Sequence, residues 1–416
     1  MSEKNDSVSR ENYLQALTEY FVSCKIKDFD EKTMDQVRRC LLDYFGCSVY
    51  AARHGCSGEL VNLIAAMGAA PGEASVWGEG KKLAPAYAAF ANACRTSNIE
   101  LDDCSGIGAS VHPGVYVMSA ALAVWEADKT SAEDFVRAVV FGYDVCMRMG
   151  LLATEKVREL GLHGPGMIGG LSAAATAGLL GGLSAGEIRN ALAITAALLP
   201  LCPFSSFMEG AGVKDLYGGW GVYLGMFAVE AAKKGITGPK HIIEGEKSLL
   251  KIFGGAKGLD VAPGTHFYIN DISFKRYSAC HSVHPAMTAI EELQGTHRMD
   301  PEKIKHVVVT TYPYSYALNQ GATDPLNPSS ARLSLSYTVA MAILDGGLSP
   351  DAFLEENMKR EDCQALRKKI QVEKNDGYGD GPFGVRGSRV RIEMTDGQVY
   401  EKEVLSPKWS SAPSNE

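Results

Sequence analysis

Apolar residues return every three or four positions from about Ser9 to Phe253, as in Met34, Val37 and Leu41. This period places them on one face of an α-helix, whereas a half-buried strand would need them at alternate positions. No part of this half alternates strands with helices in βαβ order, which argues against a doubly wound nucleotide-binding fold. We therefore predict that the first half of the chain is all-helical.

Helix start and stop signals agree with this prediction. Ser131 stands three positions before Asp134, and Ser184 stands three positions before Glu187, which is the spacing of an N-terminal capping box. Gly182 lies where the preceding helix should end.

The pattern changes after Gly254. His306–Tyr312 is rich in β-branched residues and predicts a strand. Ser388–Met394 and Gln398–Val404 alternate around Asp396-Gly397, which indicates a β-hairpin. Helices are predicted between these strands at Ala331–Leu344 and Pro350–Asn357.

A chain of 416 residues exceeds what one hydrophobic core usually covers, so two domains are expected. We predict a mostly α protein with an all-helical domain over residues 1–256 and a smaller α+β lid domain over residues 257–405. Residues 406–416, rich in Ser and Pro, are predicted to be a flexible tail.

The net charge of −8 and the absence of a Lys/Arg-rich run argue against a nucleic-acid partner. The ten cysteines contain no CxxC pair, and Met1–Glu19 is too polar for a secretory signal. These features predict a reduced, cytoplasmic protein. An anionic substrate must then be held by a local cationic pocket.

The segment Gly164–Gly186 carries no charged residue and is long enough to span a bilayer. Its Gly, Ala and Ser content is poorly hydrophobic, so a buried helix without membrane contact is the preferred interpretation. Gly164–Gly169 also matches GxGxxG, but a dinucleotide site needs a preceding strand, and Ala153–Leu160 has a helical pattern. No cofactor is predicted.

The run from Lys275 to Pro285 contains two cations and two histidines. Such a cluster suits anionic substrates and proton transfer. His281 and His284 are three positions apart, a spacing that also occurs in zinc sites, but a pair without a third ligand is a weak metal signal. We predict no metal.

Two further segments have a similar character. Asp102-Asp103-Cys104 precedes His112-Pro113-Gly114, and a histidine before proline is biased toward an extended backbone. Lys214 is flanked by glycines, where the backbone can approach a ligand closely. Each of these features also has a purely structural interpretation: a solvated acidic turn, a helix-entry histidine and a surface lysine without specific contacts.

Together, these three segments resemble the MmgE/PrpD family, which includes 2-methylcitrate dehydratases, cis-aconitate decarboxylases and iminodisuccinate epimerases. The resemblance covers most of the chain. It implies a large helical domain with a smaller lid, a homodimer, a small-molecule carboxylate substrate and acid–base catalysis without a cofactor.

The resemblance also implies roles for single residues. Three are expected to be catalytic: His112, His284 and Lys214. Seven are expected to contact substrate: Glu100, Asp102, Cys104, His163, Lys275, His281 and Tyr337. Arg148 matches a family arginine. The chain departs from the family pattern at Glu100 and Cys104, where an aspartate and a threonine are usual, and at His281, where relatives often have arginine.

The leading hypothesis is a lyase acting on a small di- or tricarboxylate by proton abstraction next to a carboxylate, with dehydration favoured over decarboxylation. An epimerase of an amino- or imino-dicarboxylate is one alternative, because two histidines from different segments could serve either reaction. A non-catalytic carboxylate-binding protein is the other, and the departures at Glu100, Cys104 and His281 motivate it.

Overall fold

The computed structural model describes residues 13–67, 71–107, 109–254, 261–379 and 386–407. The chain divides into two compact units. Unit 1 comprises Met1–Asn98, Asp102–Pro203 and Asp215–Ile272; unit 2 comprises Ile99–Leu101, Phe204–Lys214 and Ser273–Glu416. Two short segments of the first half of the sequence therefore belong to unit 2.

The prediction of a mostly α protein with a large helical region and a smaller α+β region is confirmed. The domain boundaries after residues 256 and 405 stay predictions. Residues 408–416 of the predicted tail lie outside the described part of the chain.

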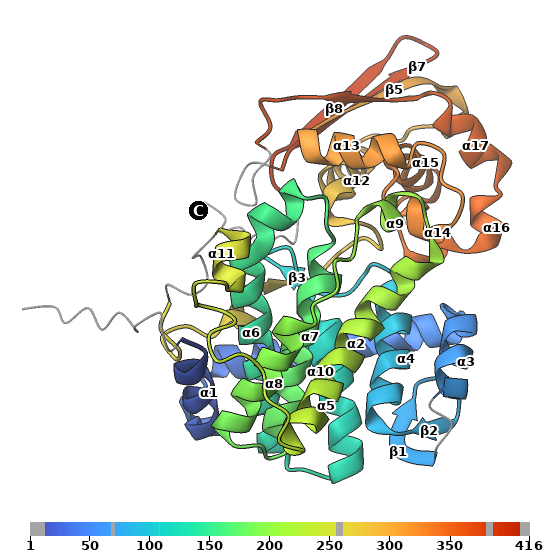
Figure 1. Ribbon diagram of the computed structural model, residues 1–416. Coiled ribbons are helices and arrows are strands. Elements are labelled where there is room, and N and C mark those ends of the chain that lie inside the picture. Colours follow the sequence, from blue (N-terminus) through green and yellow to red (C-terminus); the bar gives the residue numbers. More distant parts are fainter. Residues whose placement is uncertain (1–12, 68–70, 108, 255–260, 380–385, 408–416) are drawn as a thin grey trace, which may run out of the picture. The chain divides into compact units, whose positions relative to one another are not determined.

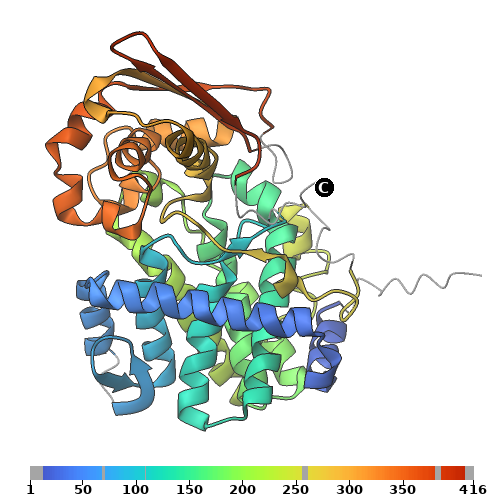
Figure 2. The ribbon, with the colours of Figure 1, turned by 180° about the vertical axis from the view of Figure 1, so that it is seen from behind.

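Unit 1 is built from helices that pack side by side (Figure 1). Their bounds are α1 Tyr13–Ser23, α2 Glu31–Arg53, α3 Gly58–Met67, α4 Pro85–Asn98, α5 Pro113–Asp128, α6 Ala132–Glu159, α7 Gly164–Leu180, α8 Ala185–Ala197, α10 Leu216–Lys233 and α11 Leu249–Phe253, with short 3-10 turns η2 Ile26–Asp28 and η4 Tyr268–Asp271. Figure 2 shows the long helix α2, in blue, running across several of the others.

Helix α7 is the centre of unit 1, since every one of its residues is buried. It packs against α5, α6, α8 and α10. A Cβ atom on Gly169 would lie 2.2 Å from the ring of Tyr116, so only glycine allows this approach. The small residues of Gly164–Gly186 thus serve helix packing, and helix α6 rather than a strand comes before them. Among the described residues, no helix is both long and apolar enough to cross a membrane.

The predicted helix signals are confirmed. The Ser131 side chain accepts a hydrogen bond from the backbone N–H of Asp134 at the start of α6. Ser184 and Glu187 form a reciprocal capping box at the start of α8. Gly182, with φ of +72°, follows the end of α7.

One element of this half differs from the all-helical prediction. Strands β1 (Pro71–Val76) and β2 (Lys81–Leu83) form an antiparallel hairpin. Side chains of α4 hold it: Asn92 bonds to Ser75 and Trp77, and Arg95 pairs with Glu79 at 2.5 Å. The hairpin is short and largely polar, so its residues show no clear alternation.

Unit 2 contains a four-stranded sheet in the order β6-β5-β7-β8. The strands are β5 Ile304–Thr311, β6 Ile370–Lys374, β7 Ser388–Met394 and β8 Val399–Val404. The predicted strand near 306–312 and the predicted hairpin are confirmed as β5, β7 and β8. Strand β6, which pairs parallel to β5, was not predicted.

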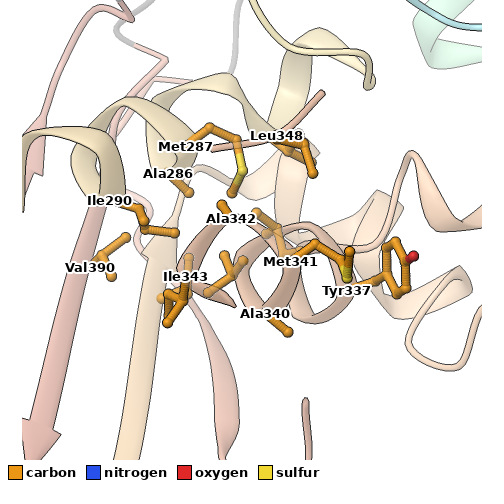
Figure 3. Close-up of a cluster of buried hydrophobic side chains, with 14 of the residues drawn as sticks. Ala286, Met287, Ile290, Tyr337, Ala340, Met341, Ala342, Ile343, Leu348 and Val390 are labelled. Atoms are coloured by element: carbon orange, nitrogen blue, oxygen red, sulfur yellow. The ribbon is translucent and has the colours of Figure 1, made fainter. Parts of the chain in front are cut away.

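Helices α12 (His284–Thr296) and α15 (Leu335–Asp345) pack together and form the core of unit 2 with the sheet (Figure 3). The remaining elements are α9 Ser205–Met208, η3 Gly212–Asp215, η5 His281–Val283, η6 Pro301–Lys303, α13 Pro313–Gly321, α14 Pro328–Ala331, η7 Pro350–Phe353, α16 Glu355–Met358 and α17 Glu361–Arg367. Strand β3 (Cys104–Ser105) belongs to unit 1, and strand β4 (Ile272–Ser273) begins at the last residue of unit 1; each has two residues. The helix predicted over Ala331–Leu344 is confirmed as α15. The helix predicted over Pro350–Asn357 is instead divided into two short elements, η7 and α16.

Candidate active site

Unit 2 holds a buried carboxylate between two lysines. The Glu100 Oε1 atom lies 2.6 Å from the Nζ atom of Lys214, and Oε2 lies 3.0 Å from the Nζ atom of Lys275. The exposed fractions of the three side chains are 9%, 3% and 0%. Two cations therefore share one carboxylate, which leaves this trio with a positive excess.

Local contacts fix the position of each member of this trio. The Lys214 ammonium lies 4.5 Å from the centre of the Phe207 ring, a favourable cation–π distance. The Ser278 hydroxyl donates to the carbonyl of Ile99, which ties the segment of Glu100 to the segment of Lys275. Glu100 itself has φ of +52°, a conformation that is uncommon for residues other than glycine.

His284, the first residue of α12, lies in the same environment. Its Nε2 atom is 3.3 Å from the carbonyl oxygen of Ala279, and its ring meets the Tyr277 ring edge-on at 5.2 Å. Burial and the nearby Lys275 ammonium lower the pKa of His284 to about 3. The imidazole is therefore neutral at pH 7, and a negative charge nearby would raise its pKa.

His281 stacks on His284, with ring centres 5.0 Å apart and planes 26° apart. Its Nδ1 atom lies 3.2 Å from the Nη1 atom of Arg386, which precedes β7. We call Glu100, Lys214, Lys275, His281, His284 and Arg386 the unit 2 cluster. Arg276, the other cation of the run, instead pairs with Glu291 and is 40% exposed.

Unit 1 holds the second predicted group. The Nδ1 atom of His112 lies 2.7 Å from the carbonyl oxygen of Asp103 and 3.4 Å from Oδ2 of Asp102. Because a carbonyl only accepts, Nδ1 carries the proton and donates, which makes Nε2 the basic nitrogen. The Asp102 carboxylate would stabilise the imidazolium that forms when Nε2 takes up a proton.

Asp103 is the residue of this group that the sequence analysis did not select. Its carboxylate accepts from the Gly114 N–H at 2.8 Å and from the Tyr143 hydroxyl at 2.6 Å. A Cβ on Gly114 would lie 2.9 Å from that carboxylate, so the His-Pro-Gly sequence permits the contact. Asp103 thereby anchors the backbone that holds His112, and the glycine after the proline was the available signal.

The family assignment rests on both parts of the chain. Residues 15–262 match the MmgE/PrpD N-terminal domain, and residues 277–415 match the MmgE/PrpD C-terminal domain. The chain belongs to the MmgE/PrpD family. The resemblance predicted from the three segments is confirmed.

Distant relatives within the MmgE/PrpD family carry the name cis-aconitate decarboxylase. The protein from Aspergillus terreus is 25% identical over 428 residues, covering 97% of this chain and 86% of its own length. The human protein is 25% identical over 382 residues, covering 86% of this chain and 77% of its own length. The mouse protein is 26% identical over 344 residues, covering 78% of this chain and 68% of its own length.

Three further residues named by the MmgE/PrpD resemblance make contacts of their own. The His163 side chain caps helix α7 by accepting from the Gly166 N–H at 3.2 Å. Tyr337 lies in the hydrophobic core of unit 2 and donates its hydroxyl proton to the Ala352 carbonyl. Arg148 forms a buried ion pair with Asp144.

Cys104 is a buried residue of β3, two positions after Asp102. Its predicted contact with substrate stays a prediction, as do the roles of the other selected residues. Within the described ranges, no three His, Cys, Asp or Glu side chains gather in a group that could hold a metal ion.

Proposed function

We propose that the chain is a lyase acting on a small di- or tricarboxylate, and that its reaction is decarboxylation of an unsaturated tricarboxylate of the cis-aconitate kind. The observation that carries the proposal is the buried Glu100 carboxylate shared by Lys214 and Lys275 beside His284. The names of the relatives support decarboxylation over dehydration, the reaction that the sequence analysis favours.

The excess of cations supports binding of an anion. Two ammonium groups around one buried carboxylate form a locally cationic environment, which favours a negative charge nearby. A substrate carboxylate would supply this charge and form short, charge-assisted hydrogen bonds with the lysines. The Lys214 and Lys275 ammonium groups would in this way hold the substrate in unit 2.

The same cations suit the chemical step. In decarboxylation the C–C bond to the departing carboxylate breaks, carbon dioxide leaves, and the bonding electron pair delocalises toward a remaining carboxylate. An ammonium group aimed at those oxygens stabilises the developing charge. An imidazolium then returns a proton to carbon, which completes the product.

His112 and His284 are the proposed proton-transfer groups. His112 has Nε2 as its basic nitrogen, and its Nδ1 atom lies 3.4 Å from the Asp102 carboxylate. His284 starts neutral, because burial and Lys275 depress its pKa. A bound substrate carboxylate would offset Lys275 and raise the pKa of His284, so that it takes up a proton only when substrate is present.

Proton NMR in D₂O with cis-aconitate, citrate, 2-methylcitrate and aspartate-derived dicarboxylates tests the reaction. We expect cis-aconitate to lose carbon dioxide and the product to gain one deuterium at carbon. Loss of water from 2-methylcitrate instead would replace decarboxylation by dehydration. Deuterium exchange into recovered amino-dicarboxylates, without loss of water or carbon dioxide, would mean that the chain is an epimerase.

The variant His112→Gln tests proton transfer. Turnover should fall by about 10²–10⁴-fold while the thermal midpoint stays nearly unchanged, because the imidazole acts in the reaction and not in the core. His54→Gln is the matched control, since His54 is an exposed histidine of unit 1. Equal activity of the two variants would remove His112 from the mechanism.

Three further predictions from the resemblance belong to this proposal. Activity should survive dialysis against a metal chelator, because side chains alone are proposed to catalyse the reaction. A homodimer should appear in analytical ultracentrifugation. Cell fractionation should place the protein in the cytoplasm.

A further inference from the structure

Asp103, in unit 1, is hydrogen-bonded through its backbone and through both carboxylate oxygens. Its N–H donates to an Asp43 carboxylate oxygen at 3.1 Å, and its carbonyl oxygen lies 2.7 Å from the Nδ1 atom of His112. Its Oδ1 atom accepts from the Gly114 N–H at 2.8 Å, and Oδ2 accepts from the Tyr143 hydroxyl at 2.6 Å. The carbonyl that meets His112 therefore belongs to a residue that is held from several sides.

Tyr143 reaches Asp103 from the middle of helix α6. The tyrosine side chain is 0% exposed, and every residue from 138 to 150 is buried. Burial and the Asp103 carboxylate raise the pKa of Tyr143 well above its usual value. The phenol therefore keeps its proton at neutral pH and donates it to Oδ2. A side chain carried by a packed helix is positioned more accurately than one on a loop.

The contact between Tyr143 and Asp103 is closed to solvent. Cys40 of helix α2 lies beside both residues and is itself buried, and burial and the Asp103 carboxylate raise the pKa of its thiol well above the usual value. A buried carboxylate depends on hydrogen-bond donors, because it has lost its water. The enclosed Tyr143 hydroxyl therefore influences chemistry through the residue that it holds, without touching a substrate.

We propose that Tyr143 is a positioning residue, which holds the Asp103 carboxylate and thereby fixes the carbonyl that keeps the His112 proton on Nδ1 and leaves Nε2 basic. The same carboxylate holds Gly114, two residues after His112, so Asp103 contacts both the imidazole and the backbone that follows it. This role rests on the proposed function, because it assumes that His112 transfers a proton during turnover.

Tyr143→Phe tests the role by removing only the hydroxyl. Without this donor the Asp103 carboxylate and its carbonyl shift, so nitrogen NMR should show part of His112 with the proton on Nε2, whereas the wild type carries it on Nδ1. Misplacing a proton-transfer group lowers the rate more than it weakens substrate binding, so kcat should fall about 10–100-fold while KM changes less than about twofold. An unchanged tautomer together with an unchanged kcat would overturn the proposal.

Tyr44→Phe is the matched control. Tyr44 is a buried tyrosine of α2 in the same unit, and its hydroxyl oxygen lies 2.8 Å from the Oγ atom of Ser119. Both variants lose one buried hydrogen bond, so both should lower the thermal midpoint, but Tyr44→Phe should keep the His112 tautomer and change kcat less than about twofold. Equal losses of kcat in the two variants would mean that Tyr143 only stabilises the fold.

A second variant approaches the same contact from Asp103. Asp103→Asn leaves one oxygen for two donors, the Gly114 N–H and the Tyr143 hydroxyl, so it should change the His112 tautomer and lower kcat as well. Because both substitutions act through one contact, the double variant should lose less than about twofold beyond the larger single loss. Multiplying losses would mean that Tyr143 acts independently of Asp103, against the proposal.

The proposed function can fail separately. If Tyr143→Phe changes the His112 tautomer while the wild type reacts with none of the carboxylates, the link from Tyr143 to His112 stands and the proposed function is wrong. If the wild type decarboxylates cis-aconitate and Tyr143→Phe keeps both kcat and the tautomer, the proposed function stands and the positioning role is wrong.

Discussion

Two buried ionic clusters, one in each unit, differ in how their charges balance. In unit 1, Arg148 and Asp144 form a pair whose side chains are both 0% exposed. In unit 2, Lys214 and Lys275 share the carboxylate of Glu100. The first cluster has one cation for each carboxylate, and the second has two.

The Arg148–Asp144 pair also has further polar contacts within unit 1. Arg148 also donates to the Tyr13 hydroxyl and to the Val261 carbonyl, each at 2.5 Å, and lies 4.9 Å from the centre of the Tyr268 ring. Protein groups thus balance this guanidinium, as expected for a structural pair. A buried pair with one cation for one carboxylate is structural here, whereas the trio with two lysines around Glu100 is the candidate carboxylate site.

The largest expected effect is on stability, in Arg148→Met. The substitution leaves the Asp144 carboxylate buried without its cation, which typically costs about 3–5 kcal/mol in the free energy of unfolding. Burial raises the pKa of Asp144, so protonation of this carboxyl should make the loss smaller at low pH. Urea denaturation measures both effects.

Arg38→Met is the control for this prediction, because Arg38 is 60% exposed on α2 and pairs with Glu31. Its unfolding free energy should change by less than about 1 kcal/mol. Similar losses in the two variants would mean that Arg148 is not a structural anchor.

The next effect is on catalysis, in Lys275→Met. Removing this ammonium should lower kcat/KM by about 10²–10³-fold, because the developing charge loses a stabilising cation. Stability should fall less than in Arg148→Met, since Lys214 still pairs with Glu100. Lys303→Met, at a lysine that is 69% exposed in unit 2, should keep full activity. A stability loss as large as that of Arg148→Met would remove the contrast between the clusters.

The smallest effect concerns the pH dependence of stability. Unfolded His284 binds a proton below about pH 6.5, whereas the folded residue does so only near pH 3. Protons therefore favour the unfolded state in this window, and stability falls as the pH drops. The slope approaches about 1.4 kcal/mol per pH unit, which amounts to about 2 kcal/mol between pH 7 and pH 5.

Denaturation of wild type and His284→Gln at several pH values measures this contribution. The variant has no titrating group at this position, so its unfolding free energy should depend less steeply on pH between 7 and 5. Parallel pH profiles would show that His284 is not held neutral by burial and Lys275.

Local patterns predicted much of the fold. The hairpin of β7 and β8 was visible because its strands alternate around Asp396-Gly397. Strand β6 was missed because its residues are mostly exposed or half-buried and its parallel partner, β5, lies some sixty residues earlier. The β1–β2 hairpin was missed because side chains of α4 hold it in place.

The candidate site was predicted in part. Lys275, His281 and His284 stood out because they share one short run. The partners of Glu100 could not be identified, since they lie 114 and 175 positions away. Arg386 gave no signal in the sequence.

The sequence by itself determined most of the helical segments, where several helices begin, and which residue types could bind a carboxylate. These properties depend on side-chain period and capping within a few neighbouring residues. The tertiary structure decided that Arg148 is balanced by Asp144, that two lysines share Glu100, and that His284 is neutral. Charge pairing and desolvation depend on distance through space and on burial, which residues far apart in the chain establish only when it folds.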